Sequence, residues 1–262
     1  PEIAFNWPTL RDNKINEIRR LNAVYDKILV SSGAELISGR GKIIDPHHVA
    51  VNDLVLSADR ILVATGGWPR VPDIPGIELT MTSNEIFDLD TLPNRILVVG
   101  GGYIAVEFAG IFAGLGVETI LSYRGPHILK EFDREIAGQL MVEMEARGIE
   151  VRLNHRLLGF SKSEGMIHVE HTGENDLDVD AVLMAVGRVP NTLELGLENT
   201  DVKTRSDGTI QVLKNFQTKE PSIYAVGDVT GTIALTPVAL AEGMALAHHL
   251  FQDEPEAVVD YA

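Results

Sequence analysis

Cysteine is absent from all 262 residues of the sequence, which excludes a disulfide framework and a thiolate metal site within this chain. Basic residues are also scarce, because 22 Lys and Arg stand against 38 Asp and Glu and give a net charge of −16. A field of that sign repels phosphate backbones and anionic lipid headgroups, so neither nucleic acid nor a membrane is expected as a partner. Any anionic ligand must therefore be bound by a local cluster of donors.

Long apolar runs are missing too, and no segment approaches the roughly 20 residues that a membrane span requires. The first ten residues, PEIAFNWPTL, contain no basic stretch followed by an apolar one, so no signal peptide is expected. Apolar residues make up 45% of the chain and charged residues 23%, the balance of a globular protein. We therefore expect a cytoplasmic protein with one large or two ordinary domains.

The order of the predicted elements indicates doubly wound α/β architecture. Apolar residues recur at helical spacing over 7–31, with Asn6 or Thr9 as a possible cap and Gly33 as a stop. Short strands with turns follow, and a proline-rich connector at 68–76 is a candidate domain boundary. From residue 93 onward, buried strands alternate with helices, a pattern typical of βαβ units around a parallel sheet.

A glycine-rich loop is the sharpest local signal. It follows a predicted strand at 95–99, precedes a predicted helix at 103–115, and consists of Gly100, Gly101, Gly102, Tyr103, Ile104 and Ala105. In this context a pyrophosphate can approach the backbone N–H groups at the helix N-terminus, where the macrodipole favours negative charge. Glycines permit that approach, and alanine is tolerated at the last position. The alternative is an ordinary glycine turn.

The next predicted strand bears on which nucleotide binds. Its end reads SYR at 122–124, without the carboxylate that commonly binds the ribose 2′-hydroxyl of NAD. Arg124 and Lys130 could together hold a 2′-phosphate in an otherwise acidic protein, and we therefore predict NADPH. The alternative for Arg124 is a solvated residue at a strand end.

Five strings in this sequence resemble, in order and spacing, those of the pyridine-nucleotide disulfide oxidoreductases, a family of FAD enzymes. They are ILVATGGWP at 61–69, GGGYIAVE at 100–107, AVGRVPN at 185–191, IYAVGDVT at 223–230 and LTPVA at 235–239. The resemblance covers essentially the whole chain. YIAVE and the basic pair are most similar to the members that reduce glutathione disulfide, so the resemblance implies NADPH and FAD as cofactors and glutathione disulfide as substrate.

The resemblance implies roles for individual residues. Tyr103 would cover the flavin until nicotinamide displaces it, Glu107 would hold the nicotinamide carboxamide, and Lys130 departs from the arginine usual at its position. Asp228 would bond the flavin ribityl chain, and Thr236 would cap a helix whose positive end stabilises charge on the reduced flavin. Without the resemblance these two are a turn aspartate and a cap with no ligand. The other residues placed at the cofactors are Arg40, Gly41, Thr65, Gly66, Gly187, Gly227 and Leu235.

The resemblance also implies a domain order. We expect part of an FAD-binding domain at 1–91, a Rossmann-like NADPH-binding domain at 92–212, and a further part of the FAD-binding domain at 213–262. The family's first glycine loop, its cysteine pair and its interface domain have no counterpart here. We therefore expect an internal fragment of a homodimeric enzyme, inactive by itself as a disulfide reductase, and we expect no metal site.

Two alternatives remain open at this point. One is another reductase of the same family, of the trypanothione, mercuric-ion or dihydrolipoyl type, although the last typically has glutamate where Tyr123 stands. The other is a non-catalytic NADPH-binding module that senses the cofactor or docks a partner.

Overall fold

The computed structural model describes residues 5–173, 177–252 and 259–261. Within it the chain forms two compact units, one made of residues 1–28 and 69–187 and the other of residues 29–68 and 188–262. The predicted domain bounds at 91/92 and 212/213 rest on cofactor binding, and they stay a prediction.

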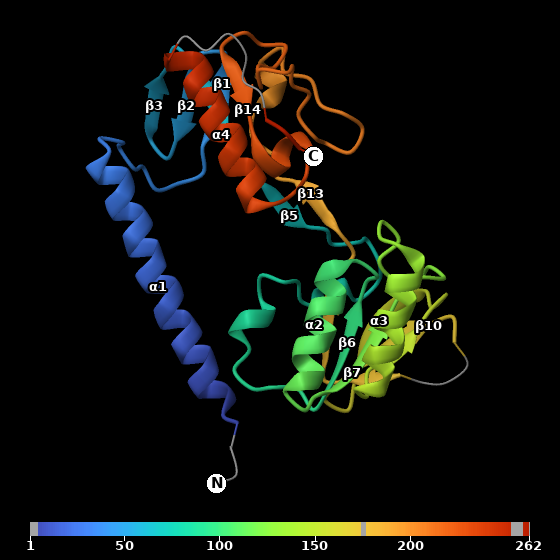
Figure 1. The fold of residues 1–262 in the computed structure, drawn as a ribbon. Helices are drawn as coiled ribbons and strands as arrows, with labels where there is room; N and C mark the ends of the chain where they lie inside the picture. The colour runs from blue at the N-terminus through green and yellow to red at the C-terminus, as the bar shows by residue number, and fades with distance from the viewer. Residues whose placement is uncertain (1–4, 174–176, 253–258, 262) are drawn as a thin grey trace. The chain divides into compact units, whose positions relative to one another are not determined.

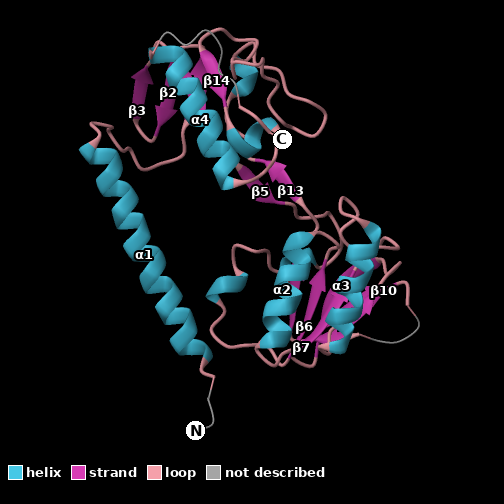
Figure 2. Ribbon diagram, in the orientation of Figure 1, coloured by secondary structure: helices cyan, strands magenta, loops and turns pink. Residues whose placement is uncertain are grey.

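A four-stranded parallel sheet organises the first unit (Figures 1 and 2). Its order is β12-β6-β7-β8, and helices α2 and α3 form the two crossovers. The bounds are β6 Arg95–Val99, α2 Tyr103–Gly114, β7 Glu118–Ser122, α3 Arg134–Ala146, β8 Glu150–Arg152 and β12 Ala181–Met184. A parallel sheet whose strands are joined by helices confirms the predicted α/β class, but both helices pack on one face of the sheet instead of covering both.

The two faces of this sheet bury alternate residues of each strand, as a period of two requires. Val98 and Leu183 pack with the apolar residues of α2 and α3. Leu97 and Val182 pack against the opposite layer, a meander of β9 Leu157–Ser163, β10 Met166–His171 and β11 Asp178–Val179. Because both faces are covered, the strands read as continuous apolar runs, and their carboxyl ends with the loops that follow remain for ligands.

Helix α1 spans Trp7–Ser31, the range predicted from its spacing. Asn6 caps it, since its side-chain oxygen accepts a hydrogen bond of 2.9 Å from the Thr9 N–H, and Gly33 follows its end with a φ of +84°. The Trp7 indole N–H donates to the Leu89 carbonyl at 2.7 Å. The helix buries none of its residues among the described part of the chain, so its apolar periodicity correctly predicted a helix but not a buried face.

The second unit combines short strands with helix α4. Strands β1, β2 and β3 form an antiparallel sheet, and β4 pairs with β14 in parallel. The bounds are β1 Lys42–Asp45, β2 His48–Val51, β3 Leu54–Ser57, β4 Ile61–Val63, β5 Gly67–Pro69, β13 Arg188–Pro190, β14 Ile223–Ala225 and α4 Thr236–Phe251. Short 3₁₀ helices lie at Ile77–Leu79 and Ile86–Asp88 in the first unit, and at Leu197–Asn199 and Gly227–Thr230 in the second. Among the helices of the described residues, none is both long enough and apolar enough to cross a bilayer.

Candidate functional site

The glycine-rich loop lies where predicted, between the end of β6 and the start of α2. Gly102 occupies the N-cap position of α2, and no side chain caps the helix there. The backbone N–H groups of the first turn therefore keep their donors available, as at helix N-termini that bind phosphate. Tyr103 begins the helix with 47% of its surface exposed, Ile104 is half-buried, and Ala105 is fully buried against the sheet.

Two glycines of this loop are required by the packing of the polypeptide itself. A Cβ at Gly100, where φ is +148°, would lie 2.2 Å from the Ala185 carbonyl oxygen. A Cβ at Gly101 would lie 2.6 Å from ring atoms of Tyr123. Glycine at position 100 is expected from the sequence for phosphate approach, whereas the structure explains it by close packing against Ala185, just after the end of the neighbouring strand β12.

Gly102 differs from both neighbours. Its φ of −90° suits any residue, and a Cβ built on it would have no heavy atom within 4 Å. Neither backbone conformation nor packing requires glycine at this position. Open space in front of a helix N-terminus is what a pyrophosphate needs for close approach, so the loop fits a dinucleotide.

The basic residues predicted to select the nucleotide follow β7. Arg124 is exposed and makes no hydrogen bond or ion pair with any residue of the described ranges. Lys130 pairs with the adjacent Glu131 at 3.2 Å, but both side chains are more than 70% exposed. Such an exposed pair contributes little stability, so the Lys130 ammonium is available to an incoming phosphate.

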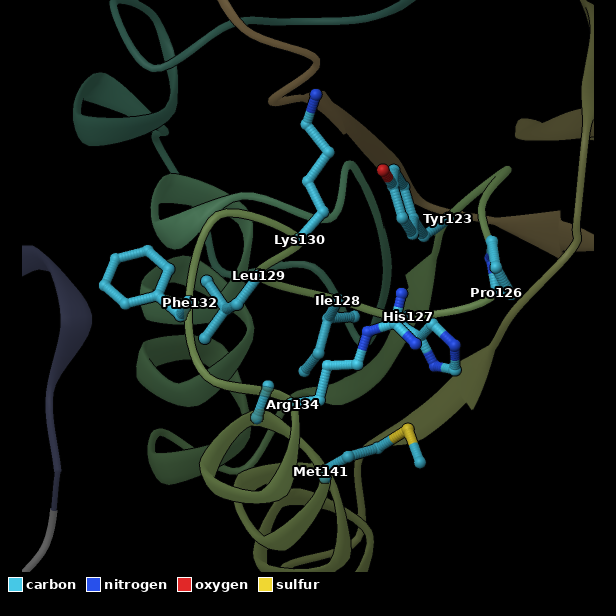
Figure 3. Close-up of a pocket in the computed structure, with 11 residues that line it drawn as sticks. Tyr123, Pro126, His127, Ile128, Leu129, Lys130, Phe132, Arg134 and Met141 are labelled. Carbon is cyan, nitrogen blue, oxygen red and sulfur yellow. The ribbon is translucent and has the colours of Figure 1, made fainter.

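The loop that carries Lys130 bounds a cavity of about 250 Å³ over the start of α3. Figure 3 shows Lys130 and Tyr123 extending to one side of the loop, with Arg134 and Met141 on the other side. His127 and Arg134 also line the cavity, and sequence reasoning missed both. Arg124 is not among the lining residues, so the structure does not bring the two predicted cations into one cavity.

Two further predicted residues lie elsewhere in the first unit. Glu107 is exposed on the second turn of α2, without a hydrogen-bond partner among the residues described. Gly187 follows β12 with a φ of +117°, a conformation that disfavours other residues, and its carbonyl accepts the Arg70 N–H at 2.9 Å. A Cβ at Gly187 would meet no heavy atom within 4 Å.

The second unit contains a cavity of about 320 Å³ at the end of β14. Four of the residues predicted to bind the flavin line it: Gly66, Gly227, Asp228 and Thr236. They come from segments more than 150 positions apart in sequence, and parallel pairing of β4 with β14 brings the segments that follow these strands together. The remaining wall is apolar or small, so a cofactor ring would meet few competing polar groups.

The prediction that Thr236 caps α4 is wrong. Leu235 holds the cap position, with extended backbone angles, and no side chain accepts a hydrogen bond from the first turn. Thr236 is instead the first helical residue and precedes Pro237 in the first turn. The N-terminus of α4 therefore lines the cavity without a capping side chain.

The other predicted residues of the second unit do not line this cavity. The Arg40 guanidinium donates to the Leu193 carbonyl at 2.8 Å, and Gly41 lies beside Val49. The Thr65 hydroxyl donates to the Asn191 carbonyl at 2.8 Å and so holds the segment that contains Gly66. Leu235 is 54% exposed.

Sequence reasoning missed Glu242, a fully buried carboxylate on α4. One oxygen accepts the Gly227 N–H at 2.6 Å, and the other accepts the hydroxyls of Thr232 at 2.9 Å and Tyr261 at 2.8 Å. Burial, together with the bond to Glu242, raises the pKa of the Tyr261 phenol to about 12. Because Gly227 lines the cavity, this carboxylate supports the cavity wall from behind. Within the described ranges, no group of three or more His, Asp or Glu side chains is placed to hold a metal ion.

Comparison with known proteins gives a consistent result. The sequence model of the pyridine nucleotide-disulphide oxidoreductase family matches residues 1–243. Glutathione reductase of Burkholderia cepacia is 42% identical over 248 residues, 95% of this chain and 55% of that protein. The chloroplastic/mitochondrial glutathione reductase of Pisum sativum is 44% identical over 97% of this chain and 46% of its own length. The chain thus spans about half the length of these relatives.

Solved structures agree on the fold. The HOCl-induced flavoprotein disulfide reductase RclA from Escherichia coli superposes with a TM-score of 0.89 and 29% identity, over 93% of this chain and 57% of that one. A Cu(II) complex of the same protein gives a TM-score of 0.79 and 32% identity over 83% of this chain and 51% of that one.

Proposed function

Because the chain belongs to the pyridine nucleotide-disulphide oxidoreductase family, we propose that the whole protein is an FAD-dependent NADPH:disulfide oxidoreductase with glutathione disulfide as substrate. Identities of 40–44% to three proteins named glutathione reductase favour this substrate over others of the family. This chain contributes the NADPH-binding region, at 92–212, and two parts of the FAD-binding region.

The observation that carries the nucleotide proposal is the open space at Gly102. A glycine that neither its φ nor its neighbours require, at the uncapped start of α2, is explained by a ligand that must approach the backbone closely. Gly100, Gly101, Gly102, Ile104 and Ala105 then hold the pyrophosphate or shape the loop around it. Arg124 and Lys130 bind the 2′-phosphate, the first through its planar guanidinium and the second as a point charge.

The flavin proposal rests on the cavity in the second unit. When FAD is bound, Asp228 would accept a hydrogen bond from its ribityl chain, and the uncapped start of α4 would stabilise the negative charge that reduction places on the ring. Arg40, Gly41, Thr65 and Gly66 serve the rest of FAD, and Tyr103, Glu107, Gly187 and Leu235 serve the nicotinamide. When bound, the nicotinamide supplies a hydride and the flavin accepts it.

Titration of the chain with NADPH and NADH tests the nucleotide assignment. Arg124→Met should weaken NADPH binding roughly 10–100-fold, the value of one hydrogen bond to a charged group, and change NADH binding by less than about twofold. Arg147→Met, at the exposed end of α3, is the matched control and should change neither. Equal affinities of the unaltered chain for the two nucleotides would refute the assignment.

Substrate and assembly require separate tests. Without cysteine, the purified 262-residue chain should not reduce glutathione disulfide with NADPH, and turnover would contradict the proposed mechanism. Homodimerisation of the whole protein, and a cytoplasmic location, stay predictions, since one relative is named chloroplastic/mitochondrial. The 29% identity to RclA keeps another flavoprotein disulfide reductase as the second candidate, and kinetics of the whole protein on a panel of disulfides would separate the two.

A further inference from the structure

Three side chains connected by hydrogen bonds lie next to the segment that carries Arg124. Ser122, the last residue of β7, is fully buried, and its hydroxyl lies 2.7 Å from His155 Nδ1. His155, 8% exposed, places its Nε2 2.9 Å from His171 Nδ1. The three residues are separated by 33 and 16 positions in sequence, and none of them is among the residues proposed to contact the nucleotide.

One backbone N–H group determines the direction of both hydrogen bonds between these three side chains. The Gly173 N–H donates to His171 Nδ1 at 2.8 Å, so that nitrogen carries a lone pair and not a proton. His155 must then donate from Nε2, which leaves its Nδ1 as the acceptor for the Ser122 hydroxyl. With both rings neutral, the Gly173 N–H and the His155 Nε2–H share the single lone pair of His171 Nδ1, whereas a proton on that nitrogen would face the Gly173 N–H.

The neutral form of His155 is also favoured by its surroundings. Burial, followed by the nearby His171 and Arg152, lowers the pKa of this imidazole to about 4, with Glu150 acting in the opposite direction. At neutral pH the network of Ser122, His155 and His171 therefore keeps the single hydrogen-bond arrangement that the Gly173 N–H imposes. A buried network with all its partners rigidifies the segment to which it is attached.

That segment is the one proposed to select the nucleotide. The His155 N–H donates to the Tyr123 carbonyl at 3.0 Å, and the Asn154 N–H donates to the Gly125 carbonyl at 3.0 Å. Between these two anchors the Tyr123 ring fills the space between two glycines, since a Cβ at Gly101 or at Gly125 would lie 2.6 Å from it. The Arg124 guanidinium has no partner in the described part of the chain, so the contacts that position this residue are those of the backbone on either side of it.

We propose that His155, linked to Ser122 and His171, is a positioning residue that determines the preference for NADPH over NADH by fixing the backbone of Arg124. This inference rests on the proposed binding of the 2′-phosphate by Arg124. It extends that proposal, because the discrimination depends on a buried network behind the binding surface as well as on the cations that contact the phosphate.

The test compares 2′,5′-ADP with 5′-AMP, two probes that differ only in the 2′-phosphate, by isothermal titration of the full chain. His155→Phe keeps a planar ring and removes both hydrogen bonds, and Ser122→Ala removes one bond with little loss of volume. We expect each to weaken 2′,5′-ADP binding about tenfold and 5′-AMP binding less than about twofold. His155→Asn, which can still accept from Ser122, should restore part of the preference.

His168→Phe is the matched control, since His168 lies on the same meander but bonds Asp178 at 2.9 Å instead of the nucleotide segment. It should change neither affinity. If the unaltered chain prefers 2′,5′-ADP and the variants at Ser122 and His155 leave that preference unchanged, the inference is overturned and the proposed function stands. If the unaltered chain shows no preference, the proposed 2′-phosphate site fails and the inference fails with it.

Discussion

Replacing Glu242 should destabilise the second unit more than replacing any exposed glutamate. This carboxylate is fully buried, and its three hydrogen-bond donors are neutral groups. In Glu242→Ala the Gly227 N–H loses the acceptor that lies 2.6 Å away. The other two donors have alternatives, because Thr232 also contacts the Thr230 hydroxyl and Tyr261 is 44% exposed to water.

The expected loss of stability follows from the one donor, the Gly227 N–H, that is left without an acceptor. One orphaned buried N–H costs about 1–3 kcal/mol, and the lost packing of the side chain adds to it. Relief from burying a charge offsets part of the sum. We therefore expect the free energy of unfolding to fall by about 2–4 kcal/mol, which corresponds to a decrease of roughly 5–15 °C in Tm.

Glu242→Gln separates hydrogen bonding from charge. Its amide oxygen can accept the Gly227 N–H, and its NH₂ can donate to the hydroxyls of Thr232 and Tyr261, which rotate to become acceptors. The cost should then be about 1 kcal/mol or less. Urea denaturation followed by circular dichroism measures both variants, with the exposed Glu145→Ala on α3 as a control expected within about 0.5 kcal/mol of the unaltered chain.

Two results would refute this reasoning. The first is a free energy of unfolding for Glu242→Ala within about 0.5 kcal/mol of that of the unaltered chain, a change no larger than that expected for a surface substitution. It would mean that the Gly227 N–H finds another acceptor, or that relief of the buried charge offsets the loss of this one. Equal destabilisation by Gln and Ala would mean that the charge itself, rather than the set of donors, stabilises the loop.

Three further predictions concern the first unit. Gly102→Ala should weaken NADPH binding about tenfold while changing stability by less than about 1 kcal/mol; unchanged binding in a calorimetric titration would contradict close approach of the pyrophosphate. Gly110→Ala lies in α2, where a new Cβ would have no heavy atom within 4 Å, and it should stabilise the fold by about 0.5–1 kcal/mol. Gly101→Ala should destabilise the fold by about 2 kcal/mol, because its Cβ would collide with the Tyr123 ring. Urea denaturation should rank the two variants in that order. Because folding lowers the pKa of His155 to about 4, the unfolded chain binds more protons than the folded one between that pH and about 6.5. The free energy of unfolding should therefore fall by at most about 3 kcal/mol as the pH drops through that range. If the dependence of stability on pH is unchanged in His155→Phe, another group causes it.

The sequence by itself determined the features that depend on neighbouring residues. The range of α1, the alternation of buried strands and helices, and the glycine loop between β6 and α2 all follow from local periodicity and from signals at helix ends. Asp133 caps α3 by accepting two backbone N–H bonds, which is a signal at a helix end of the same local kind. The family assignment belongs to this group, since it depends on strings of residues in order.

Contacts between residues distant in sequence were decided only by the tertiary structure. Glu242 lies on a helix whose sequence does not mark it as the acceptor for Gly227, and Ser122, His155 and His171 meet only because β7, the segment after β8 and the end of β10 converge. The tertiary structure also decided why each glycine of the loop is needed. Packing requires Gly100 and Gly101, and of these three residues only Gly102 has open space for a ligand. Local preferences determine which elements form, whereas the register and pairing of strands determine which side chains share a buried site.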